Sequence, residues 1–185
     1  MNNTDEAIQL ENIFYIGLLA GTFLLNTNRV LKSIALCKEC LVLLKGTEAL
    51  ITDKEYCNVV LISIYTRISK GYDLISDHTS AIEYGKKLLT LYRECGEKHT
   101  EGKISLRLAE LYQQQSKHKE AKELFIKALR IMTETGDHDK IRRCYSGLGT
   151  VFHSVGEYGK AAEYLQKALV IAKEIGDKGG EGSSY

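Results

Sequence analysis

Glycine recurs at intervals of forty residues in this chain, at Gly96, Gly136 and Gly176. A fixed period of this length is typical of repeat architectures, in which each repeat is one supersecondary unit that buries its apolar face against its neighbours. The 185 residues hold four such periods and a remainder. The spacing therefore predicts a stack of repeats and not an ordinary globular core.

The last two full repeats come into register when the chain is aligned on this period. Apolar residues recur at helical spacing in two runs per repeat, which predicts a helix–turn–helix unit. Gly136 suits the left-handed position that closes a helix and Asp137 suits the N-cap of the next one, and we expect the same of Gly176 and Asp177. The aligned pairs are Leu108 and Leu148, Ala109 and Gly149, Tyr112 and Phe152, Ala121 and Ala161, Phe125 and Leu165, and Ala128 and Ala168.

The pattern persists, with more substitutions, toward the N-terminus. Ala81 and Tyr84 lie eighty residues before Ala161 and Tyr164, whereas the first segment matches the period poorly. Terminal repeats are expected to differ because one of their sides faces water. We predict an all-α fold of about eight helices that form a single domain over residues 1–185. Its parts are four antiparallel hairpins at about 4–46, 53–95, 97–135 and 137–175, and the start of a truncated fifth repeat at 177–185.

Charge and cysteine content exclude several classes of protein. The chain has 25 basic and 24 acidic residues and a net charge of +1, which argues against nucleic-acid binding over a whole surface. Its five scattered cysteines do not form the dense, even set of a disulfide scaffold. Cys37 and Cys40 lie one helical turn apart and could share a metal ion, but no second Cys or His pair completes the four ligands of zinc. We interpret them as small buried thiols in a reducing, cytoplasmic protein, and we expect no metal.

The most apolar stretch runs from Ile13 to Leu25 and falls short of the roughly 18–20 residues that span a bilayer. Asp5, Glu6 and Glu11 precede it, whereas a signal peptide has a positively charged flank at that place. We therefore expect a buried first helix, no membrane interaction and a cytoplasmic location.

No catalytic motif occurs in the sequence. The glycines between Gly179 and Gly182 lack the strand and the Lys-Ser/Thr pair of a phosphate-binding loop, and there is no G-x-S-x-G or H-E-x-x-H motif. Four of the five histidines fall in or beside predicted turns, so they follow the helix boundaries and form no ligand cluster. We predict a protein that is not an enzyme and that uses no cofactor.

On these residues the chain resembles the tetratricopeptide repeat (TPR) family. The family signature places Leu, then Gly or Ala, then an aromatic residue on the first helix, which Leu148, Gly149 and Phe152 match, and small residues on the second helix, which Ala161 and Ala168 match. The forty-residue form with a Gly-Asp junction is similar to the repeats of LGN/Pins-type G-protein-signalling modulators and of animal NACHT–TPR proteins. The resemblance implies a right-handed superhelix (α-solenoid) that acts as a protein-interaction scaffold and binds a partner's peptide or helix on its concave face.

The resemblance also implies which residues line that face. In the family, one stripe of each first helix, adjacent to the core positions, lines the concave surface. The charged residues of this stripe are mostly basic here, and such a surface favours an acidic partner. The predicted peptide-binding residues are Arg67, Lys70, Lys103, Arg107, Glu110, Gln114, Arg143, Thr150 and Ser154.

Lys103 and Arg107 match positions at which some TPR proteins place the basic half of a carboxylate clamp. The matching positions of the first hairpin hold Leu19 and Phe23, so a complete clamp is not expected. Two alternatives stay open. The cations could pair with neighbouring carboxylates and bind nothing, or the module could self-associate as a homo-oligomer through exposed solenoid ends, within a larger signalling or NACHT–TPR-type protein.

Overall fold

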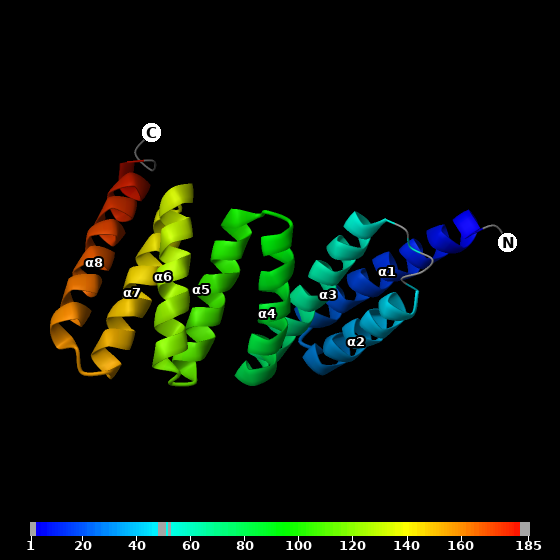
Figure 1. The fold of residues 1–185 in the computed structure, drawn as a ribbon, viewed down its shortest axis with the longest axis horizontal. Coiled ribbons are helices and arrows are strands. Elements are labelled where there is room, and N and C mark those ends of the chain that lie inside the picture. The colour runs from blue at the N-terminus through cyan, green and yellow to red at the C-terminus, as the bar shows by residue number, and fades with distance from the viewer. Residues whose placement is uncertain (1–2, 48–50, 52, 182–185) are drawn as a thin grey trace. The chain divides into compact units, whose positions relative to one another are not determined.

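The computed structural model describes residues 3–47, 51 and 53–181. Eight α-helices follow one another in these ranges, and no strand occurs in them (Figure 1). The predicted all-α fold of about eight helices is confirmed. The helices are α1 (Asn3–Asn26), α2 (Val30–Gly46), α3 (Lys54–Leu74), α4 (His78–Glu94), α5 (Lys98–Gln114), α6 (His118–Thr135), α7 (His138–Ser154) and α8 (Tyr158–Glu181).

The chain divides into two compact units, Met1–Leu91 and Tyr92–Tyr185, and each is described by itself. In the first unit, α1 packs on α2 and α3, and α2 also packs on α3. In the second unit, α5 packs on α6, α6 on α7, and α7 on α8, and the two helices of each hairpin run antiparallel (Figure 1). That residues 1–185 form a single solenoid domain stays a prediction.

The turn inside each hairpin contains one residue with positive φ. Ser76, Ser116 and Gly156, forty residues apart, have φ values of 60°, 57° and 82°. This left-handed conformation lets the following N–H group donate to a carbonyl five residues earlier, as Asp77 N does to Tyr72 O at 2.9 Å. Such a bond satisfies a carbonyl oxygen at the end of the helix, as in a Schellman cap. The forty-residue period is therefore visible in the backbone as well as in the sequence.

The predicted junction between the last two hairpins is confirmed. Gly136 closes α6 with a left-handed φ of 71°, which glycine adopts without steric cost. Asp137 follows as the N-cap of α7, and its carboxylate accepts a hydrogen bond from Lys140 N at 3.2 Å.

The corresponding prediction for Gly176 is wrong. Its φ is not positive, and α8 runs through it without a break to Glu181. Glycine permits the left-handed conformation but does not impose it, and no further helix of the described residues packs here and requires a turn. Of the predicted fifth repeat at 177–185, the residues to Glu181 continue α8, and residues 182–185 lie outside the described residues.

In two of the hairpins, aromatic rings fill the space between the first and the second helix. Tyr72 of α3 stacks on Tyr84 of α4, with 5.9 Å between ring centroids, and Phe152 of α7 stacks on Tyr164 of α8 at 5.3 Å. The two pairs are eighty residues apart in sequence. The repeat alignment therefore reflects one packing arrangement used twice.

The Cys37-x-x-Cys40 motif packs α2 against α1. Both thiols are buried, which confirms their interpretation as buried thiols. A Cβ atom on Gly17 of α1 would lie 2.7 Å from the Cys40 sulfur, so the small residue permits the close approach. Ser33 Oγ adds a hydrogen bond from α2 to Gly21 O at 2.7 Å.

The expectation of a buried first helix is wrong. Phe14 and Leu25 of α1 are buried, but Ile16 and Phe23 are 65% and 63% exposed. Apolar composition favours burial but cannot bury a face that no other helix covers. The segment Ile8–Asn26 is also long and apolar enough to cross a membrane by length and composition, a test that core helices and signal sequences pass as well. The absence of a membrane interaction therefore stays a prediction.

Candidate functional site

Three charged stripe residues of α5 and α7 meet at one shared carboxylate. Glu110 Oε1 accepts a hydrogen bond from Arg143 Nη2 at 2.6 Å, and Glu110 Oε2 accepts one from Arg107 Nη1 at 3.1 Å. The Glu110 side chain is 22% exposed, whereas those of Arg107 and Arg143 are 42% and 41% exposed. The carboxylate is thus more covered than the two guanidinium groups that it holds. We call these three residues the arginine cluster, and their formal charges sum to +1.

Helix geometry explains why the three side chains meet. Arg107 and Glu110 are three residues apart on α5, so they lie on one face of that helix. Arg143 comes from α7, the first helix of the next hairpin, which packs directly against α5. The predicted stripes of the two helices therefore form one surface.

Two hollows flank the arginine cluster. One, of about 260 Å³, is lined by Glu110, Arg143 and Thr150 among others, and the second, of about 330 Å³, is lined by Arg107, Glu110, Gln113 and Gln114. Their volumes lie near the lower end of the roughly 300–1,000 Å³ range of ligand sites. They suit single side chains of a bound segment better than an enclosed cofactor.

The smaller hollow reaches the buried ring of Phe125 from α6. A Cβ atom on Gly147 of α7 would lie 2.3 Å from Cζ of that ring. The absence of a side chain at Gly147 therefore leaves the space that the ring fills.

The remaining predicted residues of the second unit differ in their surroundings. Lys103 is exposed on α5, and its ammonium makes no ion pair or hydrogen bond within the part of the chain that the structure describes. Gln114 is exposed and lines the larger hollow. The hydroxyl groups of Thr150 and Ser154 each donate to a carbonyl oxygen one turn earlier in α7, at 3.0 Å. Ser154 lines neither hollow.

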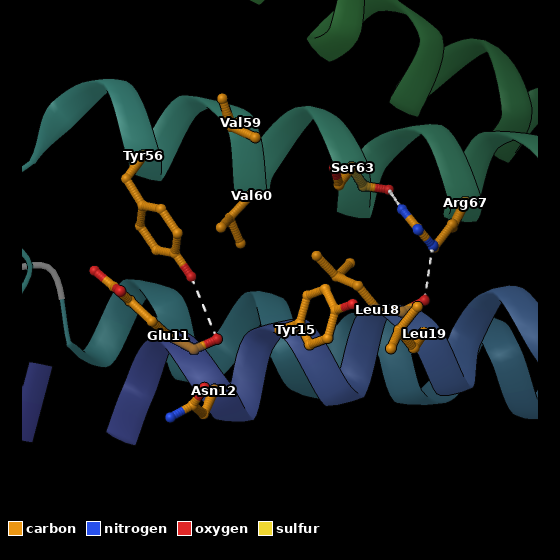
Figure 2. A pocket seen from close by; sticks show the side chains of 10 residues that line it. All are labelled: Glu11, Asn12, Tyr15, Leu18, Leu19, Tyr56, Val59, Val60, Ser63 and Arg67. Atoms are coloured by element: carbon orange, nitrogen blue, oxygen red, sulfur yellow. Dashed lines mark hydrogen bonds between the residues drawn. The ribbon is translucent and has the colours of Figure 1, made fainter. Parts of the chain in front are cut away.

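The two predicted residues of the first unit lie on α3. Arg67 is half-buried, and its Nε donates to Leu18 O at 3.1 Å while its Nη1 donates to Ser63 O at 2.8 Å (Figure 2). The Nε also donates to Thr22 Oγ1 at 2.9 Å. Arg67 therefore joins α3 to α1, a role that its place in the stripe does not indicate. Lys70 is exposed one turn later. A role of any of the nine residues in peptide binding stays a prediction.

The thiols near these surfaces are unsuited to nucleophilic chemistry. Burial raises the pKa of Cys144, next to Arg143 in α7, to about 12, and the negative charge of Glu110 adds to the shift. Burial likewise raises the pKa of Cys37 to about 11, with a further contribution from Cys40. A thiol with such a pKa is protonated at neutral pH, and the thiolate is the reactive form. Among the described residues, no group of three or more His, Cys, Asp or Glu side chains could hold a metal ion.

Residues 100–174, which include the whole arginine cluster, match the sequence model of the family described as tetratricopeptide repeat. These residues are thus similar to tetratricopeptide repeats. The resemblance predicted from the sequence is confirmed for this range, which is less than half of the chain. The finer likeness to LGN/Pins-type and NACHT–TPR proteins stays a prediction. A search of curated protein sequences found no match to the chain.

Solved TPR-like structures resemble most of the chain. The apo form of RapI is 18% identical with a TM-score of 0.73, over 92% of this chain and 58% of RapI. The STAND protein with a tetratricopeptide repeat sensor from Pyrococcus horikoshii is 18% identical with a TM-score of 0.73, over 89% of this chain and 25% of that one. The Rap conjugation gene regulator of plasmid pLS20, solved with the Phr* peptide, is 18% identical with a TM-score of 0.65, over 90% and 44%. This chain thus spans less than two thirds of each protein, and the likenesses show the fold alone.

Sequence reasoning missed four residues that line the smaller hollow, Gln113, Phe125, Arg142 and Ser146. Gln113 and Ser146 each follow a stripe residue by three positions on the same helix, so a wider stripe would have included them. Phe125 belongs to a second helix and reaches the hollow only through the space left by Gly147. That contact leaves no signal in the spacing of the sequence.

Proposed function

We propose that this chain is a non-enzymatic scaffold that binds an acidic segment of a partner protein along the stripe of α5 and α7. The arginine cluster carries the proposal. Its two guanidinium groups are held in place by Glu110 while remaining partly exposed. Bonds from guanidinium to carboxylate are charge-assisted and can be bidentate, and side chains that are already ordered lose less entropy on binding.

Other residues of the same surface support an extended acidic ligand. The exposed ammonium of Lys103 lies one helical turn before Arg107 and adds a second net positive charge to the stripe. The hollows on either side of Glu110 offer space for side chains that neighbour the acidic groups. The Rap regulator of plasmid pLS20, whose fold is similar, was solved in complex with a peptide.

Binding of a defined acidic peptide tests the proposal. The probe is a fluorescein-labelled decapeptide of Glu, Ser and Gly, and its partner has Gln in place of every Glu. We expect the Glu peptide to bind the full chain at least about fivefold more tightly at low salt, and this advantage to shrink as salt screens the charges. Equal binding of the two peptides would reject the acidic preference.

The double variant Lys103→Ala/Arg107→Ala assigns the binding to this surface. It should weaken binding of the Glu peptide while helicity, measured by circular dichroism, stays intact. The matched control, Lys160→Ala/Lys167→Ala, removes the same charge from α8, where both lysines pair with glutamates one turn away. Equal losses in the two double variants would indicate a general effect of net charge and not a binding surface.

Self-association is the second candidate function, and exposed apolar side chains favour it. Ile16 and Phe23 are exposed on α1, and Leu169 and Val170 are exposed on α8. A contact between two such different faces would join copies head to tail. Sedimentation velocity over a wide concentration range tests this idea: association should grow with concentration and be reduced by Phe23→Ser. A monomer at every concentration would reject it.

We also infer a cytoplasmic protein that contacts neither nucleic acid nor membrane. The near-balanced charge and the five cysteines, which form no disulfide bond within the described residues, support this inference, because disulfide bonds are rare in a reducing compartment. Fluorescence imaging of the tagged full chain tests the location, and accumulation at membranes would contradict it.

A further inference from the structure

A larger and more apolar hollow lies between α1 and α3 in the first unit, and it shares no residue with the arginine cluster (Figure 2). Its volume is about 470 Å³, within the roughly 300–1,000 Å³ typical of ligand sites. Tyr15 and Leu19 of α1 and Val59 of α3 line it, and each is more than half exposed. We call it the α1–α3 hollow. A ligand that covers large apolar side chains in a concave surface removes them from water, which favours binding.

The two ends of the α1–α3 hollow differ in charge. Arg67 lies at one end, and its hydrogen bonds to α1 and to Ser63 use neutral oxygen acceptors only. No carboxylate forms an ion pair with Arg67 within the ranges that the structure describes, and its Nη2 makes no hydrogen bond there. Glu11 lies at the opposite end, where Tyr56 donates its hydroxyl to Glu11 O at 3.4 Å (Figure 2). The half-buried guanidinium is therefore a positive charge without a counter-ion.

We propose that the α1–α3 hollow binds an extended partner segment that carries a bulky aliphatic side chain and, two residues away, an acidic side chain. The aliphatic group lies against Tyr15, Leu19 and Val59, and the carboxylate pairs with Arg67. This inference rests on the proposed function, since it names the partner chemistry at a second place on the first helices of the hairpins.

The spacing of the two groups follows from the geometry of the elements. Side chains at i and i+2 of an extended segment point to the same side and are about 7 Å apart along the chain. Val59 lies one helical turn before Ser63, whose carbonyl oxygen accepts from Arg67 Nη1 at 2.8 Å, and four residues of helix advance by about 6 Å. An aliphatic group against Val59 thus places an acidic group two residues away within reach of the guanidinium beside Ser63. The Glu11 end repels acidic groups, so the acidic side chain of the bound segment lies at the Arg67 end.

Short peptides test this chemistry on the full chain by fluorescence anisotropy. Two labelled peptides in a Gly/Ser background carry Leu-Ser-Glu or the reverse order, Glu-Ser-Leu. We expect at least one of the two orders to bind. Replacing its Leu with Ser should weaken binding about tenfold or more, because the burial of the aliphatic group is lost. Replacing its Glu with Gln should weaken binding about fivefold, because the charge-assisted bonds are lost.

Variants of the protein test whether the peptide binds in the α1–α3 hollow. Leu19→Asn and Val59→Asn change exposed side chains, so they should preserve the fold and weaken the same peptide. The matched control is Val42→Asn on α2, an exposed valine outside the hollow, and it should bind as the unaltered chain does. Arg67 itself is not replaced because it joins α1 to α3, and the Gln peptide tests its charge instead.

The outcomes separate this inference from the proposed function. Equal binding of the Leu and Ser peptides, or unchanged binding by Leu19→Asn, overturns the inference, while the decapeptide and Lys103→Ala/Arg107→Ala test α5 independently. If no acidic peptide binds the chain, both the inference and the proposed function are overturned. Self-association of the chain that Leu19→Asn abolishes, without peptide binding, assigns the hollow to a second copy and also overturns the inference.

Discussion

Replacing Gly147 with alanine should destabilise the second unit, although alanine favours helix. The new Cβ atom would lie 2.3 Å from Cζ and 2.4 Å from Cε1 of Phe125, whereas carbon atoms in contact are about 3.5–4.0 Å apart. The Phe125 ring is buried and rigid, so its tip cannot bend aside as the end of a lysine would. The ring must therefore move by about 1 Å or more against a packed core.

The expected loss is the difference between two effects of opposite sign. Overpacking of a filled core costs about 1–3 kcal/mol. Alanine in place of glycine in the interior of a helix contributes about 1 kcal/mol of stability. A contact as short as 2.3 Å against a buried ring belongs in the upper part of the overpacking range, about 2–3 kcal/mol. We therefore expect Gly147→Ala to lower the free energy of unfolding by about 1–2 kcal/mol. For a chain of this length, this corresponds to a fall in Tm of about 2–8 °C.

Thermal unfolding followed by far-ultraviolet circular dichroism measures this change. Gly159→Ala is the matched control, because Gly159 lies in the first turn of α8 and no atom lies within 4 Å of its added Cβ. The control should leave Tm unchanged or raise it. A Tm for Gly147→Ala that equals or exceeds that of the unaltered chain would refute the packing of Phe125 against Gly147.

Further predictions follow from two residues that cap helices, Asp137 and Asp53. Burial raises the pKa of Asp137, but hydrogen bonds from Lys140 and His99 outweigh it and lower the pKa from 3.8 to about 2. Its contribution to stability is therefore present above about pH 4 and is lost as the pH falls toward 2. The loss of unfolding free energy caused by Asp137→Asn, measured by urea unfolding, should shrink over that range. A loss that is independent of pH would contradict this. Asp53 caps α3 by accepting two backbone N–H groups, so Asp53→Ala should cost about 1 kcal/mol. Glu97→Ala should cost less in the same assay, because Glu97 at the N-cap of α5 makes no side-chain cap bond, and equal costs would speak against the capping role.

Local pattern was sufficient to predict the helices of the repeats. Their apolar residues recur at helical spacing, and the residues that fill equivalent places recur every forty positions. Tyr84 and Tyr164, aligned from the sequence, both stack on an aromatic residue of the preceding helix. The end of α8 was not predictable in this way, since Gly176 closes a helix only where a further packed element requires a turn.

The candidate site depended on contacts that are distant in sequence. The stripe correctly placed Arg107, Glu110 and Arg143 on neighbouring first helices, but it could not show that one carboxylate pairs with both arginines. Arg67 bonds to acceptors on α1 that precede it by 45 and 49 residues, so its structural role was hidden. The exposed face of α1 was also hidden, because hydropathy identifies Leu19 as apolar but not what covers it.

Opposite changes at the arginine cluster test the central claim most directly. Glu110→Gln removes the internal carboxylate that occupies both guanidinium groups, and Arg143→Gln removes one of these groups. Glu163→Gln and Lys167→Gln on α8 change the net charge in the same two ways, away from the cluster. We predict that Glu110→Gln tightens and Arg143→Gln weakens binding of the acidic decapeptide, with smaller changes in the two controls. Equal effects at α8 and at the cluster would contradict the account.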